Sequence, residues 1–261
     1  MRFARPVAHS LASPRGHPHE ARDRMSIAER WASVRADVEA ACVRAKRDPA
    51  RVTIVAVAKT HPASAIREAL AAGAMDIGEN YAQELVAKRT QLAAEGVALD
   101  AIRWHFIGRL QRNKAKLVAG QVELVHAVDG TDLADELAKR RPADAIAPQR
   151  VLLSVNVADE SSKGGAPLEL APSLARSIST IHGVRLDGFM TMPPPSDDPE
   201  ASRPAFLALA QLRDRMRDDL GLPLPVLSMG MSGDFAVAIA CGATHVRIGT
   251  AIFGARPSVA S

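Results

Sequence analysis

The feature that most constrains the fold is a repeated alternation of strand-like and helix-like segments along the chain. Short apolar runs rich in Val and Ile, bounded by turn residues, predict buried strands. Apolar residues at steps of three or four predict helices between these strands. The expected strands span residues 52–59, 75–78, 103–107, 123–127, 151–156, 185–190, 225–227 and 245–248. The expected helices span residues 63–72, 81–94, 111–119, 131–140, 168–181, 202–220, 233–241 and 251–253.

Strands that alternate with helices in this way indicate a parallel sheet. In a chain of 261 residues, eight such units favour one closed barrel over an open, doubly wound sheet. A further helix is expected before the first strand, where Ser26 and Glu29 form a capping box. We therefore expect an α/β protein with a single (β/α)8 TIM-type barrel over residues 25–256 and an extra N-terminal helix.

The two ends of the chain lie outside this repeat. Residues 1–24 contain Pro, Gly, His and five Arg without a sustained period, which predicts a disordered tail. Met25, directly before the first helix, is an alternative translation start, and in that case residues 1–24 are a mis-assigned extension. Residues 257–261 are expected to form a short C-terminal tail.

The distribution of charge and of special residues narrows the class of protein. Most of the formal charge of +4 lies in residues 1–24, and the rest of the chain carries about +1. Few aromatic rings are present on which bases could stack. Cys42 and Cys241 have neither metal-ligand nor disulfide spacing, and no apolar run reaches the about 20 residues of a membrane span. With no export signal, we expect a cytoplasmic protein that binds no nucleic acid, membrane or metal.

The first expected strand ends in a lysine. In RVTIVAVAKTHP (51–62), Thr53, Val55, Val57 and Lys59 share one face of the strand. The lysine either lies past the rim in solvent, or it is partly buried for a chemical purpose. Burial lowers the pKa of a lysine amine and makes it a nucleophile for carbonyl groups. This stretch alone leaves both interpretations open.

Two glycine-rich loops follow the seventh and eighth expected strands, where barrels of this class often bind phosphate. They read SMGMSGD (228–234) and RIGTAIFG (247–254). Small residues there allow backbone N–H groups to approach an anion. Glycines can also serve only tight turns, but two such loops in these two positions favour a phosphate site.

Several other polar residues are expected to face the barrel interior or to end its strands. Arg247 alternates with apolar neighbours and is expected inside, either to meet a ligand or to form a structural ion pair. His105 is also expected inside, as a ligand contact or as a satisfied core histidine. Asn80 and Asn156 end strands and could bind a ring hydroxyl or cap a turn. Lys163 is interpreted as a solvated loop residue.

A nucleophilic lysine, a phosphate site and an inward arginine together suit pyridoxal 5′-phosphate (PLP), through its aldehyde, phosphate and pyridine nitrogen. Over residues 26–256 the chain resembles the family of pyridoxal phosphate homeostasis proteins. Seven segments in the same order carry the resemblance: VAVAKTHP (55–62), IGENYAQE (77–84), WHFIGRLQRNK (104–114), ESSKGG (160–165), GFMTMPP (188–194), LSMGMSGD (227–234) and VRIGTAIFGAR (246–256). Two departures are Ala58, where a larger or polar residue is common, and the additional N-terminal tail.

The resemblance implies a barrel like the N-terminal domain of bacterial alanine racemase, with PLP held as a Schiff base on Lys59. Arg247 would meet the pyridine nitrogen. Asn80, which ends the second expected strand, is predicted from that position to bind the cofactor as well. The implied phosphate ligands are Ser228, Met231, Ser232, Gly249 and Thr250.

The resemblance also implies storage or delivery of PLP without robust catalysis, and hence no catalytic residue. PLP-dependent apo-enzymes are candidate recipients, and we expect a monomer. A fold-type III amino-acid racemase is the alternative, but a neutral pyridine facing Arg247 is a weak electron sink and Tyr81 is the only tyrosine. A lysine-dependent aldolase acting on a sugar phosphate is a second alternative, and it predicts a colourless protein.

Overall fold

The computed structural model describes residues 25–143, 145–158 and 164–255. The strands are β1 (Thr53–Val57), β2 (Asp76–Glu79), β3 (Arg103–Phe106), β4 (Leu124–Val128), β5 (Gln149–Asn156), β6 (Ala166–Pro167), β7 (Val184–Met190), β8 (Val226–Ser228) and β9 (His245–Ile248). The α-helices are α2 (Ile27–Arg44), α3 (Ala63–Ala71), α4 (Ala82–Ala94), α5 (Thr131–Arg140), α6 (Ala171–Ser179), α7 (Arg203–Leu220), α8 (Phe235–Ala240) and α9 (Thr250–Phe253). Short 3-10 helices are η1 (Pro49–Arg51), η2 (Leu99–Ala101), η3 (Arg112–Leu117) and η4 (Pro199–Ser202). The predictions for residues 1–24, Lys163 and 257–261 fall outside the described residues.

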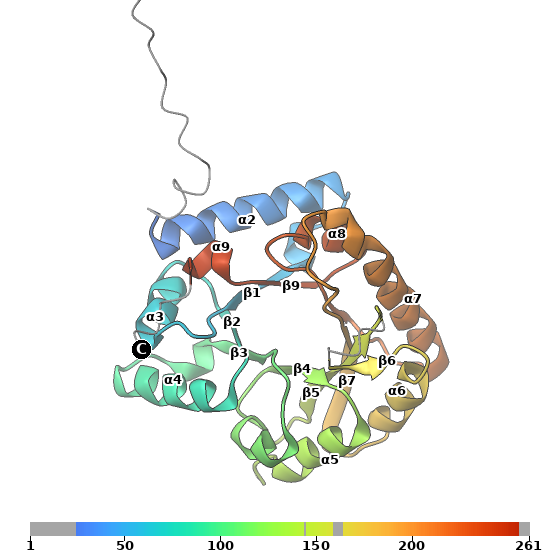
Figure 1. Cartoon of the computed structure of the whole chain (residues 1–261). Coiled ribbons are helices and arrows are strands. Elements are labelled where there is room, and N and C mark those ends of the chain that lie inside the picture. The colour runs from blue at the N-terminus through green and yellow to red at the C-terminus, as the bar shows by residue number, and fades with distance from the viewer. Residues whose placement is uncertain (1–24, 144, 159–163, 256–261) are drawn as a thin grey trace, which may run out of the picture.

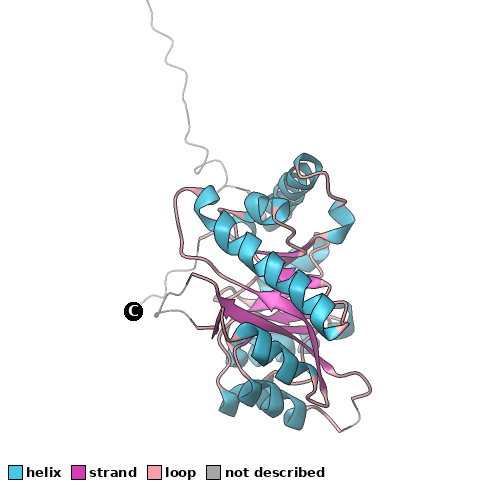
Figure 2. Cartoon of the chain, turned by 90° about the vertical axis from the view of Figure 1, so that its right-hand side faces the viewer, coloured by secondary structure: helices cyan, strands magenta, loops and turns pink. Residues whose placement is uncertain are grey.

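The strands form a closed parallel barrel. Its order is β1, β2, β3, β4, β5, β7, β8 and β9, and the β4–β5 and β9–β1 pairings close the ring. Figure 1 looks into this ring, with the helices arranged around it, and Figure 2 shows helices covering the outside of the strands. The predicted (β/α)8 barrel is therefore confirmed. The two-residue strand β6, which pairs with the end of β5, was not predicted because it is too short to produce a pattern.

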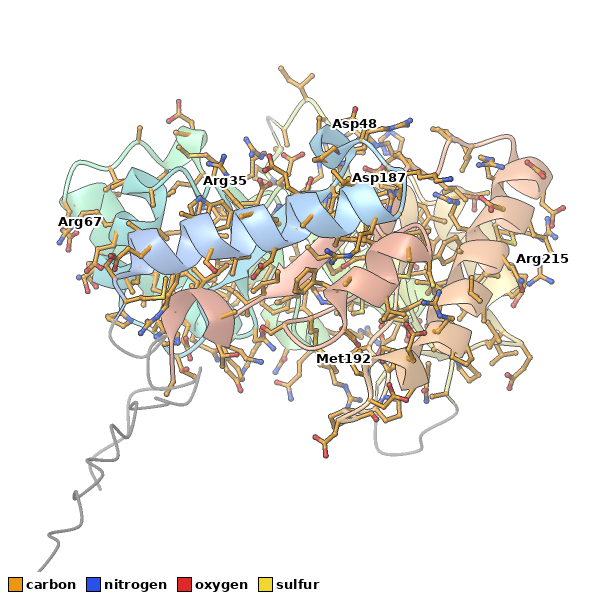
Figure 3. The ribbon with its side chains drawn as sticks, turned by 90° about the horizontal axis from the view of Figure 1, so that it is seen from above. Arg35, Asp48, Arg67, Asp187, Met192 and Arg215 are labelled. Atoms are coloured by element: carbon orange, nitrogen blue, oxygen red, sulfur yellow. The ribbon has the colours of Figure 1, made fainter. Side chains whose placement is uncertain are left out.

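Helix α2 is the predicted extra N-terminal helix. The Ser26 side chain accepts a hydrogen bond from the Glu29 backbone N–H at 3.2 Å, and the Glu29 carboxylate accepts one from the Ser26 backbone N–H at 2.7 Å. This is the expected capping box. The helix packs against α8 and α9 on the side of β1 and β9 (Figures 1 and 3). It buries Trp31, Val34 and Val38 there. In the described part of the chain, no helix is both long enough and apolar enough to cross a membrane.

Most of the apolar core lies between the strands and the surrounding helices. A smaller apolar cluster comprises Leu124, Ala127, Leu152, Met190 and Val226. It takes one residue or more from each of β4, β5, β7 and β8, which identifies it as part of the barrel interior. The barrel also buries polar side chains, among them His105, His126 and Arg247, and these determine the chemistry described below.

Candidate functional site

The predicted nucleophile and both predicted phosphate loops follow three strands that are neighbours in the barrel. Lys59 follows β1, Ser232 lies in the loop after β8, and Thr250 begins α9 directly after β9. Strand β9 pairs with β1 on one side and with β8 on the other. Lys59 and Ser232 are half-buried, and Thr250 is exposed. Parallel strands end at the same edge, so these residues share one side of the barrel mouth.

The turn that carries Lys59 lies against the segment that opens α9. A Cβ atom built on Gly249 would lie 3.4 Å from the carbonyl oxygen of Val57, the last residue of β1. The rings of His61 and Phe253 are 5.3 Å apart between centroids. Strand β1 was expected to reach Lys59, but it ends at Val57, so Lys59 is a turn residue. The Lys59 turn therefore lies at the rim of the barrel mouth, next to α9.

Arg247 lies inside the barrel below these loops. It is 6% exposed, and its Nη1 donates to the Ser228 hydroxyl at 2.7 Å while Nη2 donates to the Thr191 carbonyl oxygen at 3.0 Å. Burial lowers the pKa of Arg247 to about 10, so the guanidinium remains charged at neutral pH. Among the described residues, no carboxylate forms an ion pair with it. The structural ion pair considered above is therefore not found there, and a buried cation with neutral partners is suited to a ligand.

Ser228 lies between Arg247 and a buried histidine. Its hydroxyl is 2.8 Å from Nδ1 of His126, and its side chain is fully buried. This position favours a role in holding Arg247 over direct contact with phosphate.

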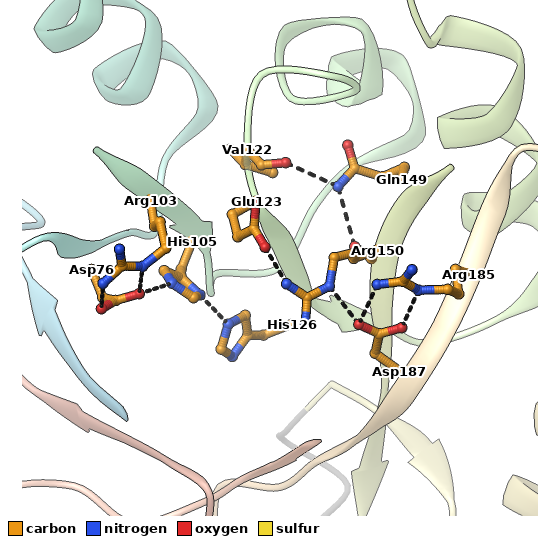
Figure 4. A network of polar contacts seen from close by, with 10 residues as sticks. All are labelled: Asp76, Arg103, His105, Val122, Glu123, His126, Gln149, Arg150, Arg185 and Asp187. Carbon is orange, nitrogen blue, oxygen red and sulfur yellow. Dashed lines mark hydrogen bonds and ion pairs between the residues drawn. The ribbon is translucent and has the colours of Figure 1, made fainter. Parts of the chain in front are cut away.

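A chain of hydrogen bonds continues from His126 across the barrel (Figure 4). His126 Nε2 is 2.9 Å from His105 Nδ1, and His105 Nε2 is 3.0 Å from the Asp76 carboxylate, which Arg103 also contacts. Burial lowers the pKa of His126 well below its usual value, so this imidazole is neutral. Burial opposes ionisation of Asp76, but hydrogen bonds from His105 and Arg103 lower its pKa to about 2.

The donor-to-acceptor direction of these linked hydrogen bonds follows from the residues at the two ends. Arg247 can only donate and ionised Asp76 can only accept. Each bond in between then has one donor and one acceptor if Ser228 donates to His126 and both imidazoles carry their proton on Nε2. His105 is thus a satisfied interior histidine. In the described ranges, no group of His, Cys, Asp and Glu is arranged to hold a metal ion.

The remaining arc of the mouth contains a pocket of about 150 Å³. Asn80, Ser154, Asn156 and Met190 are among the residues that line it. Asn80 Oδ1 is buried and has no hydrogen-bond partner among the described residues. Since buried polar atoms are rarely left unpaired, this oxygen suits a ligand hydroxyl. Asn80 and Asn156, both predicted at strand ends, are thus brought to one pocket.

The loop after β8 is shaped by a carboxylate. Asp234 Oδ1 accepts the Met231 backbone N–H at 2.6 Å, and Asp234 Oδ2 accepts the Ser202 hydroxyl at 2.9 Å. The N–H of Met231 is therefore committed within the loop. Ser232 and Thr250 remain the better placed of the predicted phosphate ligands.

Two features of the site were not predicted from the sequence. One is the support of Arg247 by Ser228 and His126, which joins residues 102 positions apart in the chain. The other is a buried cluster of Glu79 and Lys88 behind the turn of Lys59. For the cluster of Glu79 and Lys88, the sequence gives one indication. The segment IGENYAQE (77–84) places acidic residues next to Asn80, a predicted ligand.

The residues present fit PLP. Lys59, a half-buried residue, carries an amine that suits an aldehyde. The unpaired oxygen of Asn80 suits a ring hydroxyl, and Arg247 can donate to a pyridine nitrogen. The loops that contain Ser232 and Thr250 leave small residues where a phosphate would approach.

Comparisons with known proteins agree with this interpretation. Residues 32–257 match the family model for the N-terminal domain of alanine racemase. The pyridoxal phosphate homeostasis protein of Pseudomonas aeruginosa is 46% identical over 231 residues, which cover 88% of this chain and 96% of that protein. The crystal structure of an unknown protein from Bifidobacterium adolescentis has a TM-score of 0.80 at 37% identity, covering 89% of this chain and 96% of that one. The structure of PipY from Synechococcus elongatus with PLP bound has a TM-score of 0.74 at 32% identity, covering 87% and 100%.

Proposed function

The chain belongs to the family of pyridoxal phosphate homeostasis proteins, and from this membership we propose that it binds PLP in its barrel mouth as part of intracellular PLP homeostasis. The observation that carries the proposal is the position of the Lys59 turn beside α9, after a strand that pairs with the strand of buried Arg247.

Each predicted ligand residue has its own role in PLP binding. Bound PLP supplies an aldehyde that an amine can hold as a Schiff base, with loss of one water molecule. Lys59 supplies that amine, and Asn80 accepts the ring hydroxyl. Arg247 donates to the pyridine nitrogen, which keeps this nitrogen unprotonated because a guanidinium does not release its proton. The phosphate ligands are proposed to be Ser232, Gly249 and Thr250, with Met231 and Ser228 shaping the site around them.

We propose that the protein carries PLP without robust catalysis of its own. A pyridine nitrogen that faces Arg247 withdraws electrons weakly, so the cofactor is poorly activated for carbanion chemistry. Tyr81, the only tyrosine available as a second base, is 53% exposed and lines a pocket with Asn80, Arg109 and Lys114. An amino-acid racemase remains the second candidate, because the family model is that of a racemase domain.

The proposed carrier acts as a cytoplasmic monomer that passes PLP to PLP-dependent apo-enzymes. Cys42 and Cys241 are buried free thiols, which suits a reducing compartment.

The test of this function is the visible spectrum of the purified protein before and after borohydride reduction, followed by mass mapping of the labelled peptide. We expect a yellow protein whose label lies on Lys59. Lys59→Ala should lose the visible band and the label, whereas Lys139→Ala, on exposed α5 surface, should retain both. A colourless wild type, or a label on another lysine, would contradict the proposal.

Catalysis is tested separately by incubating the PLP-loaded protein with L- and D-amino acids. We expect no inversion of chirality beyond about one equivalent. Turnover of many equivalents would favour the racemase.

A further inference from the structure

A buried lysine of α4 lies behind the turn that carries Lys59. The Lys88 side chain is 9% exposed, and its Nζ donates to the Ala58 carbonyl oxygen at 2.9 Å, to Glu79 Oε1 at 2.6 Å and to Glu84 Oε2 at 2.9 Å. An ammonium group has three N–H donors, so these contacts use all of them. Lys88 therefore fixes the carbonyl group of the residue immediately before Lys59.

Glu84 fixes the residue on the other side of Lys59. The same oxygen, Oε2, that accepts from Lys88 also accepts the backbone N–H of Thr60 at 2.9 Å. Glu84 and Lys88 are one helical turn apart and face the same side of α4. One ion-paired unit on one helix thus holds both Ala58 and Thr60.

The backbone of this turn has a conformation that needs support. Thr60 has φ +65°, in the left-handed region that β-branched residues adopt rarely. Such conformations persist where the surroundings hold them, and they cluster at functional sites. The contact from Glu84 to the N–H of Thr60 supplies this support.

Glu79 provides the third member of the unit. It is fully buried at the end of β2, and its neighbour in the chain is Asn80, the predicted ring contact. Burial raises the pKa of Glu79 to about 7 against the attraction of Lys88. Buried ion pairs contribute little net stability compared with apolar residues of similar size. A buried charged cluster that grips the turn of Lys59 is therefore better explained by positioning than by stability.

We propose that Lys88, Glu84 and Glu79 are positioning residues that hold the Ala58–Thr60 backbone so that the amine of Lys59 faces the barrel mouth. The inference rests on the proposed function, because it assigns these residues to the same cofactor site.

Glu84 offers a matched pair of variants, since it is partly exposed and can be changed without burying an unpaired charge. Glu84→Ala removes the acceptor for Thr60, whereas Glu84→Gln retains an oxygen that can accept from both Thr60 and Lys88. The double variant Glu79→Gln with Lys88→Met removes both buried charges together, which avoids an uncompensated carboxylate. Leu92→Ala is the control, because Leu92 is a buried α4 residue outside the cluster.

Two measurements are made on each variant. Hydrogen exchange of the Thr60 amide, without cofactor, reports whether the turn is held. A titration with PLP, followed by the visible band and mapped to Lys59 after reduction, gives the equilibrium constant of Schiff base formation. We expect Glu84→Ala and the double variant to speed Thr60 exchange and to lower that constant about tenfold, as for loss of a charge-assisted hydrogen bond. Glu84→Gln should stay within about threefold of wild type, because the hydrogen bond is retained.

The outcomes separate the inference from the function on which it rests. If wild type forms the Schiff base on Lys59 and Glu84→Ala forms it equally well, the positioning role is wrong and the proposed function stands. The positioning role is also wrong if Leu92→Ala weakens cofactor binding as much as Glu84→Ala does, since the effect is then one of general stability. If wild type forms no Schiff base on Lys59, the proposed function and the inference both fail.

Discussion

Among single residues, Arg247 has the greatest influence on the chemistry available at the site. Its guanidinium is held on one side by the Ser228 hydroxyl and on the other by the Thr191 carbonyl oxygen. Burial lowers its pKa to about 10, which still leaves it protonated at neutral pH. In the proposed site, a permanent donor facing the pyridine nitrogen would favour the neutral ring, which is a weak electron sink.

The planar guanidinium of Arg247 donates to several acceptors at once, and a substitution can test this role. In Arg247→Lys a single ammonium cannot reach Ser228, Thr191 and a cofactor nitrogen in the same geometry. We expect PLP affinity to fall about tenfold, the effect of losing one charge-assisted hydrogen bond. Equilibrium dialysis against PLP measures this, with Arg112→Lys on the exposed surface of η3 as control. Equal affinity in the two variants would show that Arg247 does not contact the cofactor.

At the scale of elements, sequence periodicity was sufficient for the barrel but not for its irregular parts. Strand β9 and helix α5 have the predicted bounds, because local apolar patterns determine them. Segment 111–119 was expected to be a helix but contains the 3-10 helix η3, and β6 was missed. Just past the end of β1, the Ala58 carbonyl oxygen accepts a hydrogen bond from Lys88, which is 30 residues away in the chain. Contacts of this kind leave no local pattern.

In the candidate site too, some features could be predicted from the sequence and others depend on contacts between distant residues. Its strand-end residues could be located from the sequence, because a parallel barrel gathers the carboxyl ends of its strands. The hydrogen-bonding role of Ser228 inside the barrel could not be predicted from the sequence. It depends on two residues distant in the chain, His126 of β4 and Arg247 of β9.

The close pairing of β7 with β8 leaves no room for a side chain at Gly188. Gly188 has φ +149°, and a Cβ atom there would lie 1.9 Å from the carbonyl oxygen of Val226. Gly188→Ala should therefore lower the free energy of unfolding by about 3 kcal/mol or more, through overpacking and backbone strain. Gly221→Ala is the matched control, because Gly221 also has positive φ but no atom lies within 4 Å of its added Cβ. It should cost only about 1 kcal/mol.

Urea unfolding of both glycine variants measures the difference. A similar loss in the free energy of unfolding for both variants would mean that β7 and β8 can move apart slightly without destabilising the barrel.

At the scale of the whole molecule, the polar chain inside the barrel joins opposite parts of the fold. It begins at the Thr191 carbonyl oxygen after β7 and passes through Arg247, Ser228, His126 and His105 to Asp76. Residues of β2, β3, β4, β8 and β9 thus share one directional set of hydrogen bonds. Networks of this kind stabilise a unique arrangement only while every member keeps its protonation state. The stability of the barrel should consequently depend on pH.

Two histidines, fully buried His126 and half-buried His245, determine the direction of that dependence. Burial lowers the pKa of His126 well below its usual value, and burial lowers the pKa of His245 to about 3. In the unfolded chain both would titrate near 6.5, so the unfolded state binds protons first as the pH falls. Stability is therefore fully present above pH 6.5 and is lost as the pH falls towards 3, at up to about 1.4 kcal/mol per pH unit for each histidine. Asp76 acts in the same direction below pH 3.8, because its pKa is about 2 in the folded state.

Glu79 opposes this trend, so the prediction has to be tested by a difference between variants. Its raised pKa of about 7 means that the stability it contributes below pH 4.5 is lost as the pH rises. His245→Gln should reduce the proton uptake on unfolding between pH 6.5 and 4 by up to about one proton. Denaturant unfolding at several pH values gives this uptake from the slope of the free energy against pH. If His245→Gln keeps the wild-type slope, His245 takes up its proton in the folded barrel, and the interior is more accessible to water than its burial indicates.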